Sequence, residues 1–215
     1  RAINSWRGVA QDIDYFNRII DENTQDDSGY YFRALGHLAL GDAESAYLDT
    51  QESLRLGLQA REVLTANAYA RIKSSKTEEV DEGYRELATL LDENPDDALV
   101  NLYIGDFFTQ RENNKRALGF LETALELDSN LVLAHVLQSQ IYVSLGRERD
   151  ARDAVGFSVG LELPSASNYV DRGRVYTALG EIELAFSDFD EAIRINPDLA
   201  KYYNARAEGY ASKGD

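Results

Sequence analysis

The chain has 215 residues, with 38 acidic against 22 basic side chains and a net charge of −16. A field of that sign repels nucleic-acid phosphates and anionic lipid headgroups, so we expect neither nucleic-acid binding nor attachment to a membrane through basic residues. The absence of cysteine excludes disulfides and thiolate metal sites, and no apolar run reaches the ~20 residues that span a bilayer, so we expect no membrane insertion.

The first predicted element is an amphipathic helix within residues 1–26. Its apolar stripe recurs at helical spacing and consists of Val9, Ile13, Phe16 and Ile20. Trp6, the only tryptophan, is expected to pack at the end of the fold rather than to bind a ligand. The acidic run from Asp21 to Asp27 that follows lacks the glycine and the spacing of an EF-hand loop, so no metal site is predicted there.

After this helix, the sequence repeats itself with a period of 34 residues. Three series show the spacing: Gly146, Gly180 and Gly214; Ala117, Ala151 and Ala185; and Phe108, Tyr142, Tyr176 and Tyr210. Self-similarity at such a period indicates a solenoid, in which each repeat buries its apolar face only by stacking on its neighbours. We therefore expect one repeat domain over residues 1–215.

The period divides the chain into five repeats followed by a partial one. The boundaries are about 27–63, 64–97, 98–131, 132–165 and 166–199, with 200–215 as a partial repeat or capping helix. The first repeat is longer than the others, and we place its extra residues in the loop from Gly57 to Glu62. The second is the most degenerate, because Arg71 and Gly83 occupy its two small positions. The fourth carries Val155 and Ser158 on its second helix.

The fifth repeat shows most clearly why each repeat is predicted to be a pair of helices. Helical spacing of apolar and small residues runs from Tyr169 to Leu179 in a first helix, called helix A, and resumes at Ile182 in a second, called helix B. Gly180 suits the left-handed end of helix A, and Pro197 ends helix B near Asn196. The two helices should approach closely where Gly173 and Ala185 face each other.

Eight residues of this repeat resemble the tetratricopeptide repeat family pattern. They are Tyr169, Gly173, Tyr176, Gly180, Ala185, Phe189, Ala192 and Pro197. The resemblance implies an all-α fold, a right-handed α-solenoid of antiparallel helix pairs. Arg172 stands where the family usually has leucine, which we interpret as a minor departure. In the same phase, the helix within residues 1–26 corresponds to a helix B without a partner helix A.

The resemblance also implies that helices A line a concave groove, which would bind a peptide or helix of a partner protein. The predicted groove residues are Tyr31, Phe32, Tyr69, Leu102, Tyr103, Asp106, Val136, Gln140, Asp171 and Arg174. We expect this groove to be apolar along the first four repeats and charged toward its C-terminal end. The alternative is that some of these side chains pack between adjacent repeats or against the N-terminal helix. The lysine and asparagine clamp of chaperone-tail-binding family members is absent.

No pattern in the sequence indicates catalysis or a cofactor. The chain has no nucleophile elbow, zinc-protease motif, phosphate-binding loop or dinucleotide fingerprint. Its two histidines, His37 and His135, lie about three repeats apart, and His37 occupies a position where other repeats have aromatic residues. We therefore expect His37 to be a core residue and the chain to be a non-catalytic protein-interaction scaffold.

Two other roles remain open from the sequence. The chain could be a regulatory or docking domain of a larger enzyme or of a bacterial export or assembly machine, or a scaffold that associates with itself end to end. It begins at Arg1 and contains no methionine, from which we expect a piece of a longer protein. Its low lysine content with abundant arginine, aspartate and glutamate is typical of bacterial proteins. Both cytoplasm and periplasm fit this composition.

Overall fold

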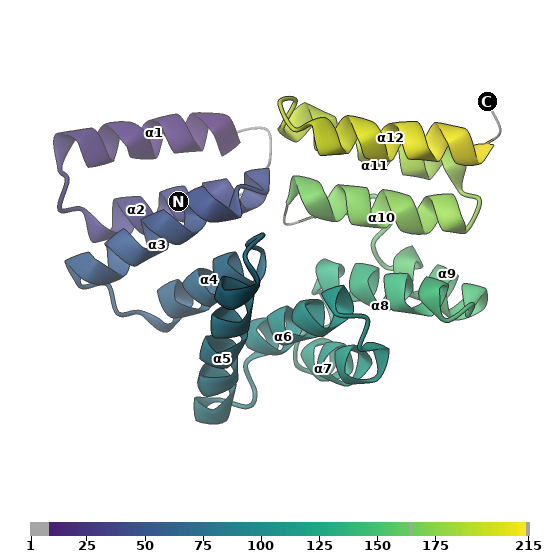
Figure 1. Cartoon of the computed structure of the whole chain (residues 1–215), viewed down its shortest axis with the longest axis horizontal. Coiled ribbons are helices and arrows are strands. Elements are labelled where there is room, and N and C mark those ends of the chain that lie inside the picture. The colour runs from purple at the N-terminus through teal and green to yellow at the C-terminus, as the bar shows by residue number, and fades with distance from the viewer. Residues whose placement is uncertain (1–8, 164, 214–215) are drawn as a thin grey trace. The chain divides into compact units, whose positions relative to one another are not determined.

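The computed structural model describes residues 9–163 and 165–213, and these form α-helices without any strand (Figure 1). The all-α fold class is therefore confirmed. The helices are α1 Val9–Glu22, α2 Asp27–Leu40, α3 Ala43–Leu56, α4 Arg61–Ile72, α5 Thr77–Glu93, α6 Ala98–Gln110, α7 Asn114–Leu127, α8 Val132–Ser144, α9 Glu148–Gly156, α10 Ala166–Ala178, α11 Ile182–Ile195 and α12 Ala200–Lys213. Trp6, for which we predicted a packing role, lies outside the described residues.

Consecutive helices pack as antiparallel hairpins, which is the α-solenoid arrangement predicted from the period. The hairpins are α2 with α3, α4 with α5, α6 with α7, α8 with α9, and α10 with α11. The chain divides into two compact units, Arg1–Asp96 and Asp97–Asp215, and the division falls between the second and third repeats. We call them the N-terminal unit and the C-terminal unit.

In the N-terminal unit, α1 covers one side of α2, and α3 packs on α4. The predicted amphipathic helix is confirmed over Val9–Glu22, and its residues Phe16 and Ile20 are buried. A β-carbon placed on Gly36 would stand 2.8 Å from Cγ1 of Ile13, so the glycine lets α1 lie close against α2. The N-terminal helix thus packs on the first repeat as a preceding helix B would.

The extra residues of the repeat array lie in α5, and the predicted location in the loop after Gly57 is wrong. Helix α5 has 17 residues, whereas α3 and α7 have 14 each. The close approach in this hairpin joins Gly83 to Ala68, whose carbonyl oxygen would lie 2.7 Å from a β-carbon at Gly83. Cβ of Arg71 would lie 2.8 Å from the same point, but Ala68 is the eighth residue of α4, as Gly105 is of α6 and Gly173 of α10, so Ala68 occupies the small position of α4.

In the C-terminal unit, the hairpins stack through neighbouring helices, and α12 packs on α10 and α11. The predicted ends of the fifth repeat are confirmed: α10 is followed by Gly180 at φ +77°, and α11 ends at Ile195. The backbone N–H of Glu181 donates to the carbonyl of Tyr176 over 2.8 Å, as in a glycine-terminated helix end. The helix ends in the structure therefore lie where Gly180 and Pro197 predicted them.

The fourth repeat departs from the expected length of helix B. Helix α9 has 9 residues and ends at Gly156, so Ser158 lies beyond the helix that we predicted to contain it. The segment that follows is held by side chains of the next repeat. The Tyr169 hydroxyl accepts from the backbone N–H of Leu163 over 3.2 Å, and the Arg172 guanidinium donates to the carbonyls of Ser158 and Leu161.

Candidate functional site

The candidate site of the C-terminal unit is the row of helices A that pack side by side: α6 on α8, α8 on α10, and α10 on α12. We define the A-face as the side chains at the second, fifth, sixth, ninth, twelfth and thirteenth residues of these four helices. The guanidinium of Arg174 lies 3.6 Å from the carboxylate of Glu208, and both are ninth residues, on α10 and α12. Equivalent positions of neighbouring repeats are therefore adjacent on this face.

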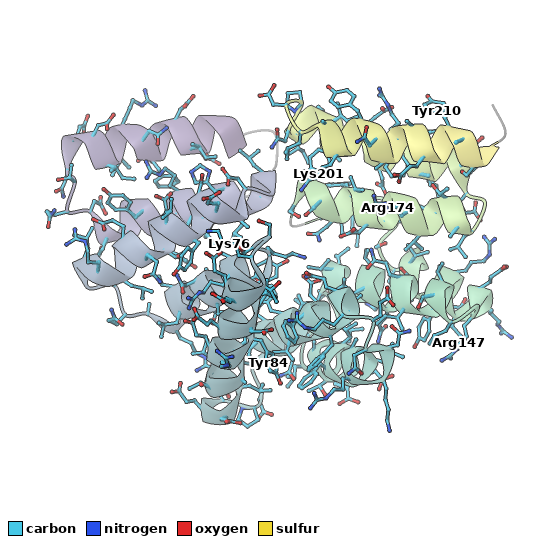
Figure 2. All side chains as sticks on the ribbon, viewed as in Figure 1. Lys76, Tyr84, Arg147, Arg174, Lys201 and Tyr210 are labelled. Atoms are coloured by element: carbon cyan, nitrogen blue, oxygen red, sulfur yellow. The ribbon has the colours of Figure 1, made fainter. Side chains whose placement is uncertain are left out.

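Four of the predicted groove residues reach the surface of the A-face. Arg174 is exposed, while Tyr103, Gln140 and Asp171 are half-buried on α6, α8 and α10. Figure 2 labels Arg174 on α10 and Lys201 at the start of α12, where a second exposed cation extends the same face. The accessible part of the A-face thus combines an aromatic residue with amide, carboxylate and cationic groups.

Three other predicted groove residues of this unit are buried. Leu102 is 2% exposed, Val136 is 0% exposed and Asp106 is 2% exposed. Leu102 and Val136 are therefore core residues, whereas Leu99, the second residue of α6, is 46% exposed, so only part of the predicted apolar groove is accessible in this unit. The alternative interpretation, in which apolar A-helix residues pack inside the fold, describes these positions.

The remaining predicted groove residues, Tyr31, Phe32 and Tyr69, lie in the N-terminal unit. The Phe32 ring stacks on Phe16 of α1 with ring centroids 5.5 Å apart, so it is at least partly a packing residue. Tyr69 is 8% exposed on α4. Tyr31 is half-buried, and burial raises the pKa of its hydroxyl, with a smaller contribution from the charge of Glu62. Tyr31 and Phe32 are both partly exposed, whereas Tyr69 is buried.

A buried ion pair in the fifth repeat is the polar feature that sequence reasoning missed. Arg172 Nε and Nη2 donate to the two carboxylate oxygens of Asp188, each over 2.7 Å, and both residues are 4% exposed. Burial, the largest influence, raises the pKa of the Asp188 carboxyl, although its hydrogen bonds with Arg172 act in the opposite direction. The sequence did contain a signal for this pair, because Arg172 stands where the family usually has leucine. An arginine at a position that is normally buried requires a hydrogen-bond acceptor for its guanidinium.

The histidines do not form a shared site. His37 lies in the N-terminal unit, half-buried and 3.6 Å from a carboxylate oxygen of Asp49, and burial lowers its pKa. His135 belongs to the C-terminal unit, where its ring stacks on Phe157 at a centroid distance of 4.7 Å.

Among the described residues, no three His, Asp or Glu side chains are grouped so as to hold a metal ion. Among the helices of the described residues, none is both long enough and apolar enough to cross a membrane.

Comparison with known proteins connects this architecture to one family. Residues 166–199 match the model of the tetratricopeptide repeat, over the boundaries that we predicted for the fifth repeat. No curated protein sequence is similar enough to the chain to count as a match.

Solved structures share the fold, and two of the three named here are tetratricopeptide repeat proteins. A thermophilic member from Thermus thermophilus superposes with a TM-score of 0.66 at 16% identity, over 86% of this chain and 99% of that one. One from Parabacteroides merdae gives 0.65 at 16% identity, over 94% and 78%. PilW, described as a widely conserved type IV pilus biogenesis factor, gives 0.57 at 13% identity, over 92% and 90%. At these identities the likeness is one of fold.

The resemblance found in the sequence is confirmed: residues 166–199 are a tetratricopeptide repeat, and the chain has the fold of tetratricopeptide repeat proteins. Folds of this kind generally act as scaffolds for protein interaction and generally carry no catalysis.

Proposed function

We propose that the chain is a non-catalytic scaffold that binds a peptide or helix of a partner protein on the A-face of its C-terminal unit. The observation that carries the proposal is the continuity of this face across neighbouring repeats, seen where Arg174 of α10 meets Glu208 of α12. A surface built from equivalent positions of successive helices suits an elongated ligand, because each repeat offers contacts at regular spacing.

The chemistry of the accessible residues favours a polar peptide with aromatic or aliphatic anchors. Tyr103 offers a large ring at low entropic cost, and Asp171, Arg174 and Lys201 offer charges of both signs. Because Leu102 and Val136 are buried, we assign binding to these accessible aromatic and charged residues rather than to a continuous apolar groove. Substituting either buried residue would test folding and not binding.

Selection of peptides from a random phage-displayed library, with the chain as bait, tests the proposal. The selected peptides should bind the double variant Asp171→Arg and Arg174→Glu at least tenfold more weakly, since this variant reverses two charges of the A-face without changing the net charge. The matched control is Lys115→Glu with Glu122→Lys, which likewise reverses two exposed charges without changing the net charge, but on α7, a helix B. Peptides that respond to the control and ignore the A-face variant would refute the assignment.

A further inference from the structure

The segment that follows α9 turns three apolar side chains toward solvent. Phe157, Val159 and Leu161 are 67%, 50% and 48% exposed, and Phe157 is the most exposed large apolar residue among those described. All three lie inside the repeat array, before the first helix of the fifth repeat. Exposed apolar side chains gathered within a few residues are characteristic of interaction sites.

The neighbouring repeats show how the fourth repeat departs from the common pattern. Helices α7 and α11 have 14 residues each, whereas α9 has 9. One period before and after Phe157 stand Thr123 and Glu191, so the fourth repeat has an aromatic ring where its neighbours have polar side chains. Val159 is exposed, whereas Leu125, its counterpart on α7, is half-buried. The early end of α9 therefore leaves apolar side chains uncovered.

Contacts with the fifth repeat hold the backbone of this segment in place. Arg172 donates to the carbonyls of Ser158 and Leu161. The backbone N–H of Leu163 donates to the Tyr169 hydroxyl over 3.2 Å. Ser158 and Leu163 are 0% and 1% exposed, so they anchor the segment on both sides of its exposed residues. Because the backbone is already fixed, a ligand would not have to order it on binding.

A histidine of α8 extends the apolar surface formed by these side chains. The His135 ring stacks on Phe157 with its plane inclined by 20°, and its Nε2 lies 3.3 Å from the carbonyl oxygen of Ser129. We define the loop patch as the side chains of Phe157, Val159, Leu161 and His135. It is distinct from the A-face, since His135 is the fourth residue of α8 and the other three follow a helix B.

Acidic residues flank the loop patch. Asp153 precedes Phe157 by one helical turn, Glu162 lies in the segment itself, and both carboxylates are exposed. Arg152, which is adjacent to Asp153 in the sequence, is engaged elsewhere, because it binds Glu181 beside the start of α11. The loop patch therefore combines apolar side chains with flanking negative charge, in a chain whose net charge is −16.

We propose that the loop patch is a docking site for a segment of a partner protein whose apolar residues are flanked by lysine or arginine. The Phe157 ring and its aliphatic neighbours supply the contact area, and Asp153 and Glu162 attract the basic flanks. The same carboxylates disfavour a second copy of this chain, which would bring like charges together, and they repel an anionic lipid surface. Charge complementarity thus selects a basic, apolar peptide segment as the occupant.

Peptides selected from a random phage-displayed library test this proposal. The bait is the full chain with Asp171→Arg and Arg174→Glu, so that ligands of the A-face are not selected. We expect the selected peptides to combine aromatic or aliphatic residues with lysine or arginine. In fluorescence anisotropy, they should bind Phe157→Ser with Val159→Ser at least tenfold more weakly than wild type. Because wild type and the bait should bind them equally, the result is independent of the A-face proposal.

Two exposed leucines provide the matched control for this double variant. Leu48→Ser with Leu145→Ser removes side chains that are 61% and 48% exposed and lie outside the loop patch, so it should leave binding within threefold of wild type. Far-UV circular dichroism of all variants establishes that they fold. Equal losses of binding in the two double variants would overturn the proposal.

A charge variant tests the same site without changing its apolar residues. Asp153→Lys with Glu162→Lys should weaken binding at least tenfold. Glu44→Lys with Glu78→Lys makes the same change in net charge on exposed residues of the N-terminal unit and should leave binding within threefold at physiological salt. The proposal is also overturned if the selected peptides are acidic, or if neither loop-patch variant weakens their binding. Self-association in light scattering, or binding to phosphatidylglycerol vesicles, would likewise overturn it if Phe157→Ser with Val159→Ser abolishes it.

Discussion

Replacing Asp188 by alanine should destabilise the C-terminal unit more than any change to its surface ion pairs. The substitution leaves Nε and Nη2 of Arg172 without their acceptors at a site where both partners are 4% exposed. Removing one partner of a buried, doubly hydrogen-bonded pair costs about 3–5 kcal/mol, because the remaining charge stays desolvated. We therefore expect a loss of that size in the free energy of unfolding.

Asp190→Ala is the matched control, because Asp190 lies two residues away on the same helix and also binds an arginine. Its partner Arg206 and its own carboxylate are 35% and 62% exposed, so the pair should contribute less than about 1 kcal/mol. The assay is urea denaturation followed by far-UV circular dichroism, with hydrogen exchange of α10 and α11 amides as the local readout. Equal losses for the two variants would refute the reasoning.

Two further predictions concern packing and pH. Gly173→Ala should cost about 1–3 kcal/mol, because its β-carbon would stand 2.6 Å from the Phe189 ring, whereas Gly119→Ala, with nothing within 4 Å, should stabilise α7 by about 0.5–1 kcal/mol. Urea midpoints that move in the same direction for both variants would contradict this. Burial lowers the pKa of His37 below its ordinary 6.5, so the stability that depends on neutral His37 is present above pH 6.5 and lost as pH falls through the lowered pKa. In the variant His37→Gln, the free energy of unfolding of the N-terminal unit should fall less as the pH is lowered below 6.5. If its pH dependence equals that of the wild type, His37 does not contribute to the loss of stability in acid.

Much of the fold could be predicted from the sequence because its signals are local. The 34-residue period, Gly180 at the end of α10 and Pro197 after α11 act through backbone geometry within a few residues, and the structure has helix ends there. The three extra residues were misplaced because apolar spacing alone does not distinguish a longer helix from a longer loop. Helix α5 continues through them.

The candidate site was predicted less well, since a helical stripe does not reveal what packs against it. Leu102 and Val136 occupy positions that the resemblance assigns to a groove, yet both are buried. Tyr103 and Arg174 occupy comparable positions and remain accessible. Equivalent positions also differ, because the ninth residue is buried in α6, where it is Asp106, and exposed in α10, where it is Arg174, and this difference comes from the neighbouring helices.

The sequence by itself determined the helix pairs, their repetition and the excess of acidic charge, because these follow from composition and from contacts close along the chain. The tertiary structure alone decided which faces are open and which polar groups are paired. Arg33 and Arg172 each bind an aspartate on helix B, 16 residues further along the chain, and the repeat pattern revealed neither pair. The physical reason is that burial and ion pairing depend on residues brought together from different helices, whose distances the repeat pattern does not specify.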